Sequence, residues 1–391
     1  MYPAMNDSVA SRPRAEIVVD LDAVRRNVAA LKGRIEGRKM MTVVKADGYG
    51  HGLVPVARAA RDGGADWLGV ATMEEALALR ESGDTGPILT WLAVPGEDYR
   101  EAIRAGIDVS ASTVAALHEI AAAAREVDVV ARVQLKVDTG LHRGGSSVEL
   151  WPELVAAAAE LERVGAVRIA GIWSHFACSD QPEQPANDVQ EQVFRSALKV
   201  VEAEGLTPEV RHLCNSAAAV TRPSSWFDMV RCGIATYGLS PIPDHQTSTQ
   251  LGLVAAMTVR GRFALVKRVP RGSGISYGHT YVTDKDTNVG VVPMGYGDGI
   301  PRHASSKALV LAAGRVRSIA GRVCMDQFVV DLDDDEAAVG DPVVLFGTGA
   351  DGEPTAQDWA EACDTISYEI VTRVGGRLAR RYVGERVEEN L

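Results

Sequence analysis

The sequence predicts an α/β protein in which a (β/α)8 barrel of the TIM type is followed by a C-terminal, mostly β domain. Three observations lead to this prediction. Eight short apolar runs alternate with Ala-rich helical stretches before residue 240, as the strands and helices of such a barrel do. The alternative, an open doubly wound sheet, usually has fewer strands and a Gly-x-Gly-x-x-Gly turn, which the sequence lacks. After Leu239 the pattern changes to short β-branched runs separated by turn residues.

Length and composition bound the class of protein. The 391 residues, 46% hydrophobic and 24% charged, fit two domains with large cores. A net charge of −11 disfavours nucleic acid as a partner, because that would need clustered Lys and Arg. The 5 cysteines show neither C-x-x-C pairs nor metal-like spacing, so we expect no metal and a reducing compartment. Without a signal-peptide core or an apolar run of about 20 residues, we expect a soluble, cytoplasmic protein with no membrane partner.

The elements are predicted as follows. We expect a loose N-terminal arm over residues 1–14, the barrel over residues 15–240 and the β domain over residues 241–391. A strand at Glu16–Asp20 leads into a first helix. The predicted barrel strands are Met40–Val44, Trp67–Ala71, Ile88–Trp91, Asp108–Ser110, Ala131–Val137, Ile169–Ser174, Glu209–Leu213 and Asp228–Val230. The predicted helices between them include Leu53–Arg61, Glu74–Ser82, Ser112–Arg125, Leu150–Val164 and Val189–Glu204.

In the second half, Pro241-Ile242-Pro243 marks a linker, and turn residues such as Gly314 and Gly340-Asp341 separate the β-branched runs. A single helix is expected near Ala356–Ala362. The predicted strands are Met257–Leu265, Thr287–Pro293, Ala308–Leu311, Arg315–Ala320, Gln327–Leu332 and Pro342–Phe346.

Lys45 stands at the C-terminal end of a predicted buried strand, where the active-site groups of a barrel gather. Partial desolvation lowers the pKa of such a lysine and frees its amine as a nucleophile, as Schiff-base chemistry requires. The glycines that follow let backbone amides approach an anion closely, and Tyr49 adds a hydroxyl. The alternative interpretation is a solvated lysine at a strand end, followed by a Gly-rich turn.

Other polar residues follow the remaining predicted strands. Each has an ordinary interpretation by itself, such as a packed histidine or a surface arginine. Together with Lys45 they place two lysines, two arginines, a histidine and small anion-binding groups at one end of the barrel, and a buried cluster of cations needs an anion. A phosphate near the last strands would supply it. These residues are Lys136, Arg143, His175, Asn215, Ser216, Arg231, Gly233 and Ile234.

The run Val43-Val44-Lys45-Ala46-Asp47-Gly48-Tyr49-Gly50-His51-Gly52 resembles the pyridoxal-phosphate lysine motif of alanine racemases, with Asp-Gly where the family usually has Asn-Ala. Five further segments resemble motifs of the same family: Asp228–Gly238, Ser276-Tyr277-Gly278, Gly295–Gly299, Cys324–Gln327 and Ser367-Tyr368-Glu369. The resemblance runs from about Arg14 to the C-terminal end. It implies a pyridoxal-phosphate-dependent isomerase that works as a homodimer with active sites shared between subunits.

The resemblance also implies the role of each residue. The enzyme would interconvert L-alanine and D-alanine through a pyridoxal-phosphate aldimine on Lys45, and D-alanine would serve peptidoglycan synthesis. Lys45 would be one base, and Tyr277 of the partner subunit would be the other. The implied cofactor-binding residues are Tyr49, His175, Asn215, Ser216, Arg231, Gly233, Ile234 and Tyr368. The implied substrate-binding residues are Arg143, Tyr296 and Met325, and Lys136 corresponds to a lysine that is carbamylated in many members.

These roles are chemically coherent. Racemisation removes a proton on one face of a planar carbanion and returns one on the other face, so two opposed bases are needed. Arg231 would face the pyridine nitrogen with His175 behind it. Because an arginine stays charged, it cannot stabilise a protonated pyridine nitrogen as a carboxylate would, and this weaker electron sink limits transamination.

Three alternatives remain open at this point. A decarboxylase of basic or diamino acids with the same two-domain plan would place a carboxylate, not Arg231, against the pyridine nitrogen and would carry a Gly-rich phosphate loop. A non-enzymatic pyridoxal-phosphate-binding protein would consist of the barrel alone and would lack Tyr277. A racemase of broader specificity, for serine or other amino acids, has the same motifs, because one hydroxyl group is discriminated only weakly.

Overall fold

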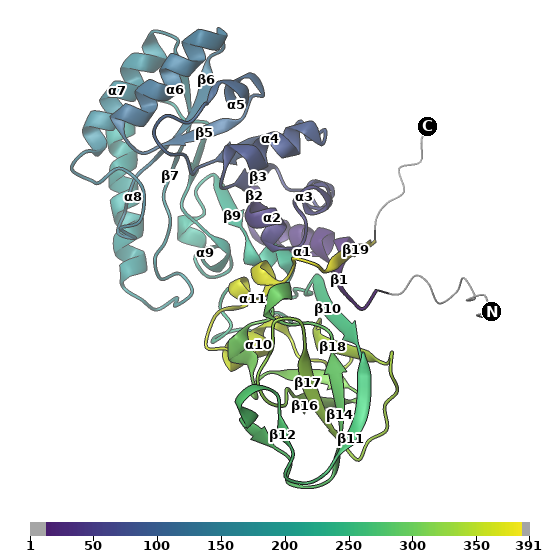
Figure 1. The fold of residues 1–391 in the computed structure, drawn as a ribbon. Helices are drawn as coiled ribbons and strands as arrows, with labels where there is room; N and C mark the ends of the chain where they lie inside the picture. The colour runs from purple at the N-terminus through teal and green to yellow at the C-terminus, as the bar shows by residue number, and fades with distance from the viewer. Residues whose placement is uncertain (1–12, 385–391) are drawn as a thin grey trace, which may run out of the picture. The chain divides into compact units, whose positions relative to one another are not determined.

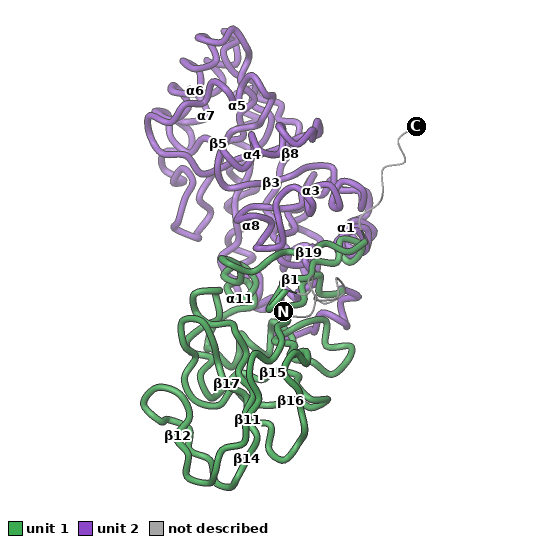
Figure 2. Tube along the Cα trace, turned by 45° about the vertical axis from the view of Figure 1, so that its right-hand side comes forward, with its two compact units in different colours: residues 1–23, 254–391 green, residues 24–253 purple. Residues whose placement is uncertain are grey.

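The structure is a computed structural model that describes residues 13–384, so most of the predicted arm over residues 1–14 lies outside the described residues. The chain divides into two compact units (Figure 2). Unit 2 comprises residues 24–253. Unit 1 comprises residues 254–391 together with residues 1–23. The N-terminal strand therefore belongs with the C-terminal half of the sequence.

Unit 2 is built on eight parallel strands in the order β8-β7-β6-β5-β4-β3-β2-β9 (Figure 1). Each corresponds to one predicted strand, and the predicted (β/α)8 barrel is confirmed. The strands are β2 (Lys39–Val43), β3 (Trp67–Val70), β4 (Ile88–Thr90), β5 (Asp108–Ala111), β6 (Ala131–Lys136), β7 (Val167–Trp173), β8 (Val210–His212) and β9 (Met229–Cys232).

Strands β8 and β9 approach one another at the two ends of this sheet, which makes the barrel nearly closed. Arg231 N donates to Cys214 O (3.0 Å), and Asp228 N donates to Arg211 O (3.1 Å). The carboxylate of Asp228 also binds the guanidinium of Arg211 at 2.6 Å. Backbone bonds and an ion pair thus replace a regular ladder at the closing point.

Helices lie outside the strands (Figure 1). Two of them begin at threonine caps: Thr72 forms a capping box with Glu75, and Thr113 accepts from Ala116 N. Two short helices, α5 and α9, were not predicted because they are too brief to show a helical period. The segment labelled α2 (Lys45–Tyr49) has non-helical backbone angles and is described with the site. The helices are α1 (Leu21–Arg34), α3 (Leu53–Asp62), α4 (Met73–Glu81), α5 (Arg100–Arg104), α6 (Val114–Val127), α7 (Trp151–Arg163), α8 (Ala186–Ala203) and α9 (Ser216–Thr221).

Unit 1 is mostly β, as predicted. A six-stranded sheet has the order β16-β15-β18-β10-β1-β19, and a three-stranded sheet has the order β11-β14-β17. The strands of these sheets are β1 (Ala15–Asp20), β10 (Met257–Arg262), β11 (Leu265–Val269), β14 (Thr287–Val292), β15 (Leu309–Ala312), β16 (Arg315–Ser318), β17 (Phe328–Asp333), β18 (Pro342–Phe346) and β19 (Ala379–Val383). A hairpin joins β12 (Gly274–Ile275) to β13 (Tyr281–Val282), and the helices are α10 (Ala356–Ala362) and α11 (Ser367–Arg373).

Strand β1 departs from the predicted division, which assigned residues 15–240 to the barrel. It pairs antiparallel with β10 and parallel with β19 inside the six-stranded sheet. Ile17 and Val19 are fully buried there. A short apolar strand does not reveal its partners by its own pattern, because pairing across more than 200 residues depends on the whole fold.

Two further predictions needed correction. The predicted strand Met257–Leu265 is divided between β10 and β11, because Phe263 turns its ring into the core where Gly290 has no side chain. The predicted linker at Pro241–Pro243 is not a free connection: Ile242 is buried, and Leu251 O accepts from the side chain of Arg34 at 2.7 Å. This segment therefore packs as part of unit 2.

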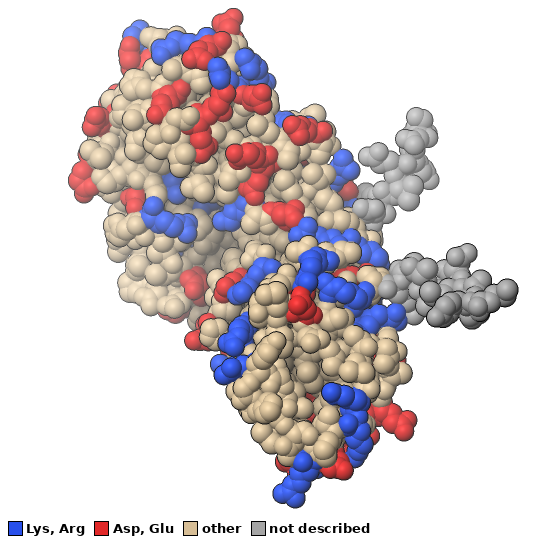
Figure 3. All heavy atoms as spheres, in the orientation of Figure 1, with Lys and Arg blue, Asp and Glu red and all other residues tan. Residues whose placement is uncertain are grey.

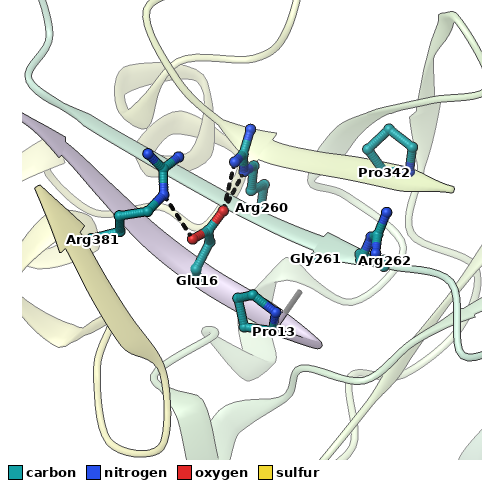
Figure 4. A pocket seen from close by; sticks show the side chains of 7 residues that line it. All are labelled: Pro13, Glu16, Arg260, Gly261, Arg262, Pro342 and Arg381. Atoms are coloured by element: carbon teal, nitrogen blue, oxygen red, sulfur yellow. Dashed lines mark hydrogen bonds and ion pairs between the residues drawn. The ribbon is translucent and has the colours of Figure 1, made fainter. Parts of the chain in front are cut away.

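Glu16 joins three neighbouring strands of the six-stranded sheet (Figure 4). Its carboxylate binds Arg260 of β10 at 2.6 Å and Arg381 of β19 at 3.1 Å. Burial alone would raise the pKa of Glu16, but the hydrogen bonds and charges of the two arginines outweigh it, and the pKa is lowered. The ionised carboxylate thus stabilises the position of β1 between its neighbours. A pocket opens beside it, also lined by Pro13, Gly261, Arg262 and Pro342.

We predict that Glu16→Gln lowers the free energy of unfolding by about 1 kcal/mol at pH 7, since the arginines are half exposed. Because the folded-state pKa lies below the ordinary value of 4.5, the stabilisation is present above pH 4.5 and is lost as the pH falls through the folded pKa. Urea unfolding should therefore show the difference from wild type shrinking in acid. Glu336→Gln, at an exposed position, is the control. A difference that stays constant with pH would contradict this role.

Candidate active site at the C-terminal end of the barrel

The segment after β2 begins the site with an unusual backbone. Lys45 is followed by four residues with positive φ: Ala46 (53°), Asp47 (54°), Gly48 (61°) and Tyr49 (52°). Three of them are not glycine, and a left-handed conformation costs roughly 1–2 kcal/mol for each such residue. The sequence indicated a turn here but not this left-handed one.

Two carboxylates hold this turn in place. Glu75 Oε1 accepts from Ala46 N at 2.6 Å, while its Oε2 accepts from Ala71 N at 2.9 Å. Asp47 Oδ1 accepts from Leu53 N at 2.8 Å, at the start of α3. The strained backbone is therefore over-determined by its surroundings, which is typical of functional segments.

Four cationic side chains come from the ends of the barrel strands: Lys45 after β2, Lys136 in β6, Arg143 in the following loop, and Arg231 in β9. Burial, with the charges of Arg231 and Arg143, lowers the pKa of Lys136 to about 8. Burial and Arg143 also lower the pKa of Lys45, although Glu75 opposes the shift. Between Pro13 and Gly384, the structure records no hydrogen bond or ion pair for either lysine amine. Both amines therefore lose their protons more readily than a surface lysine does.

Two tryptophans lie against these cations. Lys136 Nζ is 4.4 Å and the Arg231 guanidinium carbon 5.1 Å from the ring centroid of Trp173. Lys45 Nζ lies 5.8 Å from the centroid of Trp91, and the two indole rings are 6.0 Å apart. Aromatic faces attract cations without cancelling their charge, so the site keeps its positive potential.

A folded loop carries Arg143 to this end of the barrel. Asp138 Oδ1 accepts from three successive amides, those of residues 140, 141 and 142. Gly145 has a φ of 128°, and a Cβ there would lie 2.6 Å from Asp138 N, so only glycine fits. Ser146 N then donates to Lys136 O at 2.8 Å, which returns the loop to β6.

Two neutral histidines surround the guanidinium of Arg231. Its Nη1 donates to His212 Nδ1 at 3.0 Å, and its Nη2 lies 3.1 Å from His175 Nδ1. Nη2 also donates to the carbonyl oxygens of Ser174 (2.8 Å) and Leu213 (3.1 Å). Burial, reinforced by Arg231, lowers the pKa of both histidines well below their ordinary value. Arg231 therefore keeps a positive charge that no described carboxylate pairs with.

Small groups meet beside the last strand. Ser216 Oγ accepts from Gly233 N at 2.8 Å, and Asn215 Oδ1 accepts from Ala218 N at the start of α9. A Cβ on Gly233 would lie 2.4 Å from the Tyr49 hydroxyl oxygen, so the absent side chain is what lets that hydroxyl approach the backbone. Ile234 is fully buried directly after this glycine.

The remaining predicted residues belong to unit 1. Tyr277, Tyr296 and Met325 have 71%, 42% and 54% of their surfaces exposed. Their loops are adjacent. Tyr296 N donates to Cys324 O at 3.0 Å, and Ser276 Oγ donates to Arg322 O at 2.7 Å. Tyr368 lies half-buried in α11.

A buried carboxylate holds two of these loops together. Asp298 is fully buried and accepts from Arg377 Nε at 3.0 Å, and Arg377 Nη1 donates to Asp326 Oδ1 at 2.7 Å. Gly297 N, next to Tyr296, donates to Met325 O at 2.9 Å. The side chains of Tyr296 and Met325 are thereby presented from one rigid part of unit 1.

The structure thus gathers the barrel residues of the prediction in unit 2 and the remaining four in unit 1. Sequence reasoning missed Trp173 and His212, which contact Arg231 from the last positions of β7 and β8. It also missed Gln134, a buried polar residue in β6. The sequence did offer a signal for each of them. Gln134 stands two residues before Lys136 in the same strand, and Trp173 and His212 are an aromatic and a polar residue at strand ends.

Comparison with known proteins identifies the family. The N-terminal domain of alanine racemase matches residues 19–241, and the C-terminal domain of alanine racemase matches residues 256–382. The chain belongs to the alanine racemase family. The alanine racemase of Thermobifida fusca is 55% identical over 370 residues, which cover 95% of this chain and 98% of the relative. That of Salinispora tropica is 54% identical over 374 residues, covering 95% and 99%.

Solved alanine racemases share the fold. The enzyme from a D-cycloserine-producing Streptomyces lavendulae superposes with a TM-score of 0.95 at 53% identity, covering 96% of this chain and 98% of that one. The Streptomyces coelicolor enzyme gives 0.94 at 52% identity, with 95% and 98% covered. These findings confirm the prediction of an isomerase that interconverts the enantiomers of alanine.

Two surface observations complete the description. None of the helices between residues 13 and 384 is long and apolar enough to cross a membrane. Acidic and basic side chains are interspersed over the viewed face of both units (Figure 3).

The pKa of Lys136 can be tested chemically. We predict that Lys136 of the cofactor-free protein, in carbon-dioxide-free buffer, reacts with an acylating reagent at a rate that rises with pH and has its midpoint near pH 8. Peptide mass spectrometry measures the extent of acylation at Lys136. Arg143→Met should raise this midpoint, because one neighbouring cation is removed. Arg271→Met, an exposed arginine of unit 1, is the matched control and should not move it. A midpoint above about 10 in the wild type would contradict the cation cluster.

Proposed function

We propose that this alanine racemase holds pyridoxal 5'-phosphate at the carboxyl end of its barrel and uses Lys45 and Tyr277 as opposed bases. The observation that carries the proposal is the cluster of four cations around Lys45, none of which has a described carboxylate partner. When bound, the cofactor supplies an electron sink for the amino acid and an anion for the cluster. A solved alanine racemase of Bacillus anthracis, 32% identical with a TM-score of 0.86, holds bound L-Ala-P, which supports an amino-acid-like ligand here.

The residues present fit this cofactor. Gly233 and Ile234 follow the last barrel strand beside the Tyr49 hydroxyl, where a side chain on Gly233 would block the approach, and the Ser216 hydroxyl binds Gly233 N. We assign the phosphate to these groups, with Asn215 fixing the start of α9 and Tyr368 contributing a further hydroxyl. The surplus positive charge of the barrel end complements a phosphate.

Arg231 would bind the pyridine nitrogen. Its Nη1 and Nη2 donate to histidine and backbone acceptors, while no residue between 13 and 384 accepts from its Nε. The guanidinium remains charged, so it donates a hydrogen bond but transfers no proton to the nitrogen. This arrangement favours racemisation over transamination, because the cofactor withdraws electrons less strongly.

Lys45 has the properties of the base on one face. Burial and neighbouring cations lower the pKa of its amine, so a larger fraction of the amine is free to take a proton than in a surface lysine. Arg143 would bind the substrate carboxylate. The Glu75 carboxylate accepts from the backbone amide that follows Lys45 and so fixes the turn from which the Lys45 side chain extends.

The second base would come from another copy of the chain. Tyr277, Tyr296 and Met325 form an exposed group on unit 1, and exposed aromatic and methionine side chains are typical of interfaces. We propose a homodimer in which the β domain completes the active site of the partner's barrel domain. Tyr277 would deliver the proton on the face opposite Lys45, with the cations lowering the cost of its phenolate.

Lys136 is a candidate for carbamylation. An amine with a pKa of about 8 has a much larger neutral fraction at physiological pH than an ordinary lysine, although the protonated form is still the majority. The neutral amine adds carbon dioxide at its nitrogen and releases one proton, which leaves a carbamate anion. Counted from the protonated lysine, two protons are released and a cation is converted into an anion. A carbamate would then pair with Arg143 and offset the repulsion among the four cations.

Of the alternatives, the decarboxylase is disfavoured because an arginine, Arg231, stands where that enzyme would place a carboxylate, and because the Gly-rich phosphate loop is absent. The barrel-only binding protein is overturned by the matched C-terminal domain. Activity on serine as well as alanine is compatible with the proposal, because it would extend the substrate range of the same site without changing its chemistry.

The covalent role of Lys45 can be tested directly. We predict that borohydride treatment of the purified protein fixes one cofactor on each chain, at the peptide that contains Lys45, as read by mass spectrometry. Lys45→Ala should abolish the attachment, whereas Lys136→Met should retain it at Lys45. Cofactor still fixed to the Lys45→Ala protein would disprove the assignment.

The shared site can be tested by mixing two inactive variants. Lys45→Ala and Tyr277→Phe should each lack racemase activity. In a mixed dimer with an isologous interface, one site collects both changes and the other is intact, so equal refolding together should restore roughly a quarter of normal activity. Separately refolded variants are the control. No recovery, with mixed dimers confirmed by native mass spectrometry, would place Tyr277 in its own chain's site.

A further inference from the structure

A row of four buried polar side chains runs through the barrel interior to the proposed cofactor site. It consists of Asp108 in β5, Gln134 in β6, His212 in β8 and Arg231 in β9. Their exposed fractions are 2%, 0%, 0% and 4%. The racemisation chemistry uses only Arg231, so the other three need an explanation of their own.

The two ends of the row have fixed hydrogen-bonding roles. Asp108 accepts from Arg132 Nε at 2.7 Å and from Gln134 Nε2 at 2.8 Å, so both of its oxygens face donors. Arg231, at the other end, can only donate. Gln134 and His212, between them, could each be oriented in either of two ways.

The fixed ends select one orientation. Because Gln134 directs its Nε2 at Asp108, its Oε1 faces His212 Nε2 at 2.7 Å and must accept from it. His212 is neutral and carries one ring proton, since burial lowers its pKa. With that proton on Nε2, the Nδ1 lone pair is left to accept from Arg231.

The packing around the row holds the His212 ring and the Gln134 amide in their positions. The ring of His212 stacks on Trp173 at 5.8 Å with an angle of 6° between the planes. Gly171 leaves the space that the Gln134 amide occupies, because a Cβ there would lie 2.7 Å from its Oε1. A change of hydrogen-bond direction must therefore pass along the whole row.

We propose that Asp108 and Gln134 are positioning residues that fix the tautomer of His212 and, through it, the orientation of Arg231. The consequence for catalysis rests on the proposed function of Arg231, whereas the tautomer does not. If the proton were on Nδ1 instead, the Nδ1–H of His212 would face the Nη1–H of Arg231, two donors would meet, and the guanidinium would have to move.

Asp108→Asn is the decisive substitution, because it keeps the shape of the side chain while it replaces one acceptor with a donor and removes the charge that faces Arg132. Arg132 can only donate, so it retains the asparagine oxygen and turns the asparagine amide group towards Gln134. Gln134 must then present its oxygen to that group and its own NH2 to His212. His212 Nε2 becomes an acceptor, and its proton moves to Nδ1.

The double variant Asp108→Asn/Arg132→Met provides the matched rescue. Without Arg132, the asparagine can present its oxygen to Gln134, and the original direction returns. Solid-state ¹⁵N spectra of histidine-labelled full-length protein read the tautomer directly, with His212 assigned by its loss in His212→Gln. We expect Nε2–H in the wild type, Nδ1–H in the single variant and Nε2–H in the double variant.

Turnover is the second readout. The single variant should lose about 10-fold to 100-fold in kcat, as expected for a misplaced binding group, and the double variant should recover most of it. A wild-type His212 protonated on Nδ1, or a single variant that keeps Nε2–H, would overturn the proposal. A tautomer that switches and returns while kcat stays constant would instead overturn the role assigned to Arg231.

Discussion

The constraint on which the site depends is uncompensated positive charge. Four cationic side chains converge from the ends of three strands, β2, β6 and β9, and like charges repel strongly where protein displaces water. They are Lys45, Lys136, Arg143 and Arg231. Two described carboxylates oppose this repulsion only in part, Glu75 at Lys45 and Asp138 at Lys136, because the pKa of each lysine is still lowered. The fold therefore maintains a region that favours anions. A phosphate, a substrate carboxylate and a carbamate are three anions that can occupy it.

The barrel interior satisfies hydrogen bonds at this region without neutralising it. His175 and His212 accept from Arg231 while remaining uncharged, and Trp173 faces the cations with its ring. Asp108 lies too far along the row to pair with Arg231, and its charge is already shared with Arg132. The result is a guanidinium that is held firmly but stays fully positive. Under the proposed function a racemase would benefit from this arrangement, because a carboxylate at the place of Arg231 would strengthen the electron sink.

Much of this could be predicted from the sequence. The barrel strands follow from local apolar runs, and Lys45, Lys136 and Arg231 are found because barrel chemistry occurs at strand ends. Strand β1 was placed in the barrel domain, and not with its sheet in unit 1, because its partners are distant in sequence. The left-handed turn after Lys45 depends on Glu75 from another helix, so no local pattern encodes it. His212 and Gln134 were missed because a buried polar residue in a strand gains its meaning only from its neighbours in space.

The most direct test of the central claim is the stability of the cofactor-free protein in carbon-dioxide-free buffer. We predict that Lys136→Met raises the free energy of unfolding by about 1 kcal/mol or more, because methionine packs on Trp173 without adding charge to the cluster. Lys267→Met, at an exposed position of unit 1, should change it little. A lower free energy of unfolding for Lys136→Met would mean that the cations are compensated within the chain, and the claim would fail.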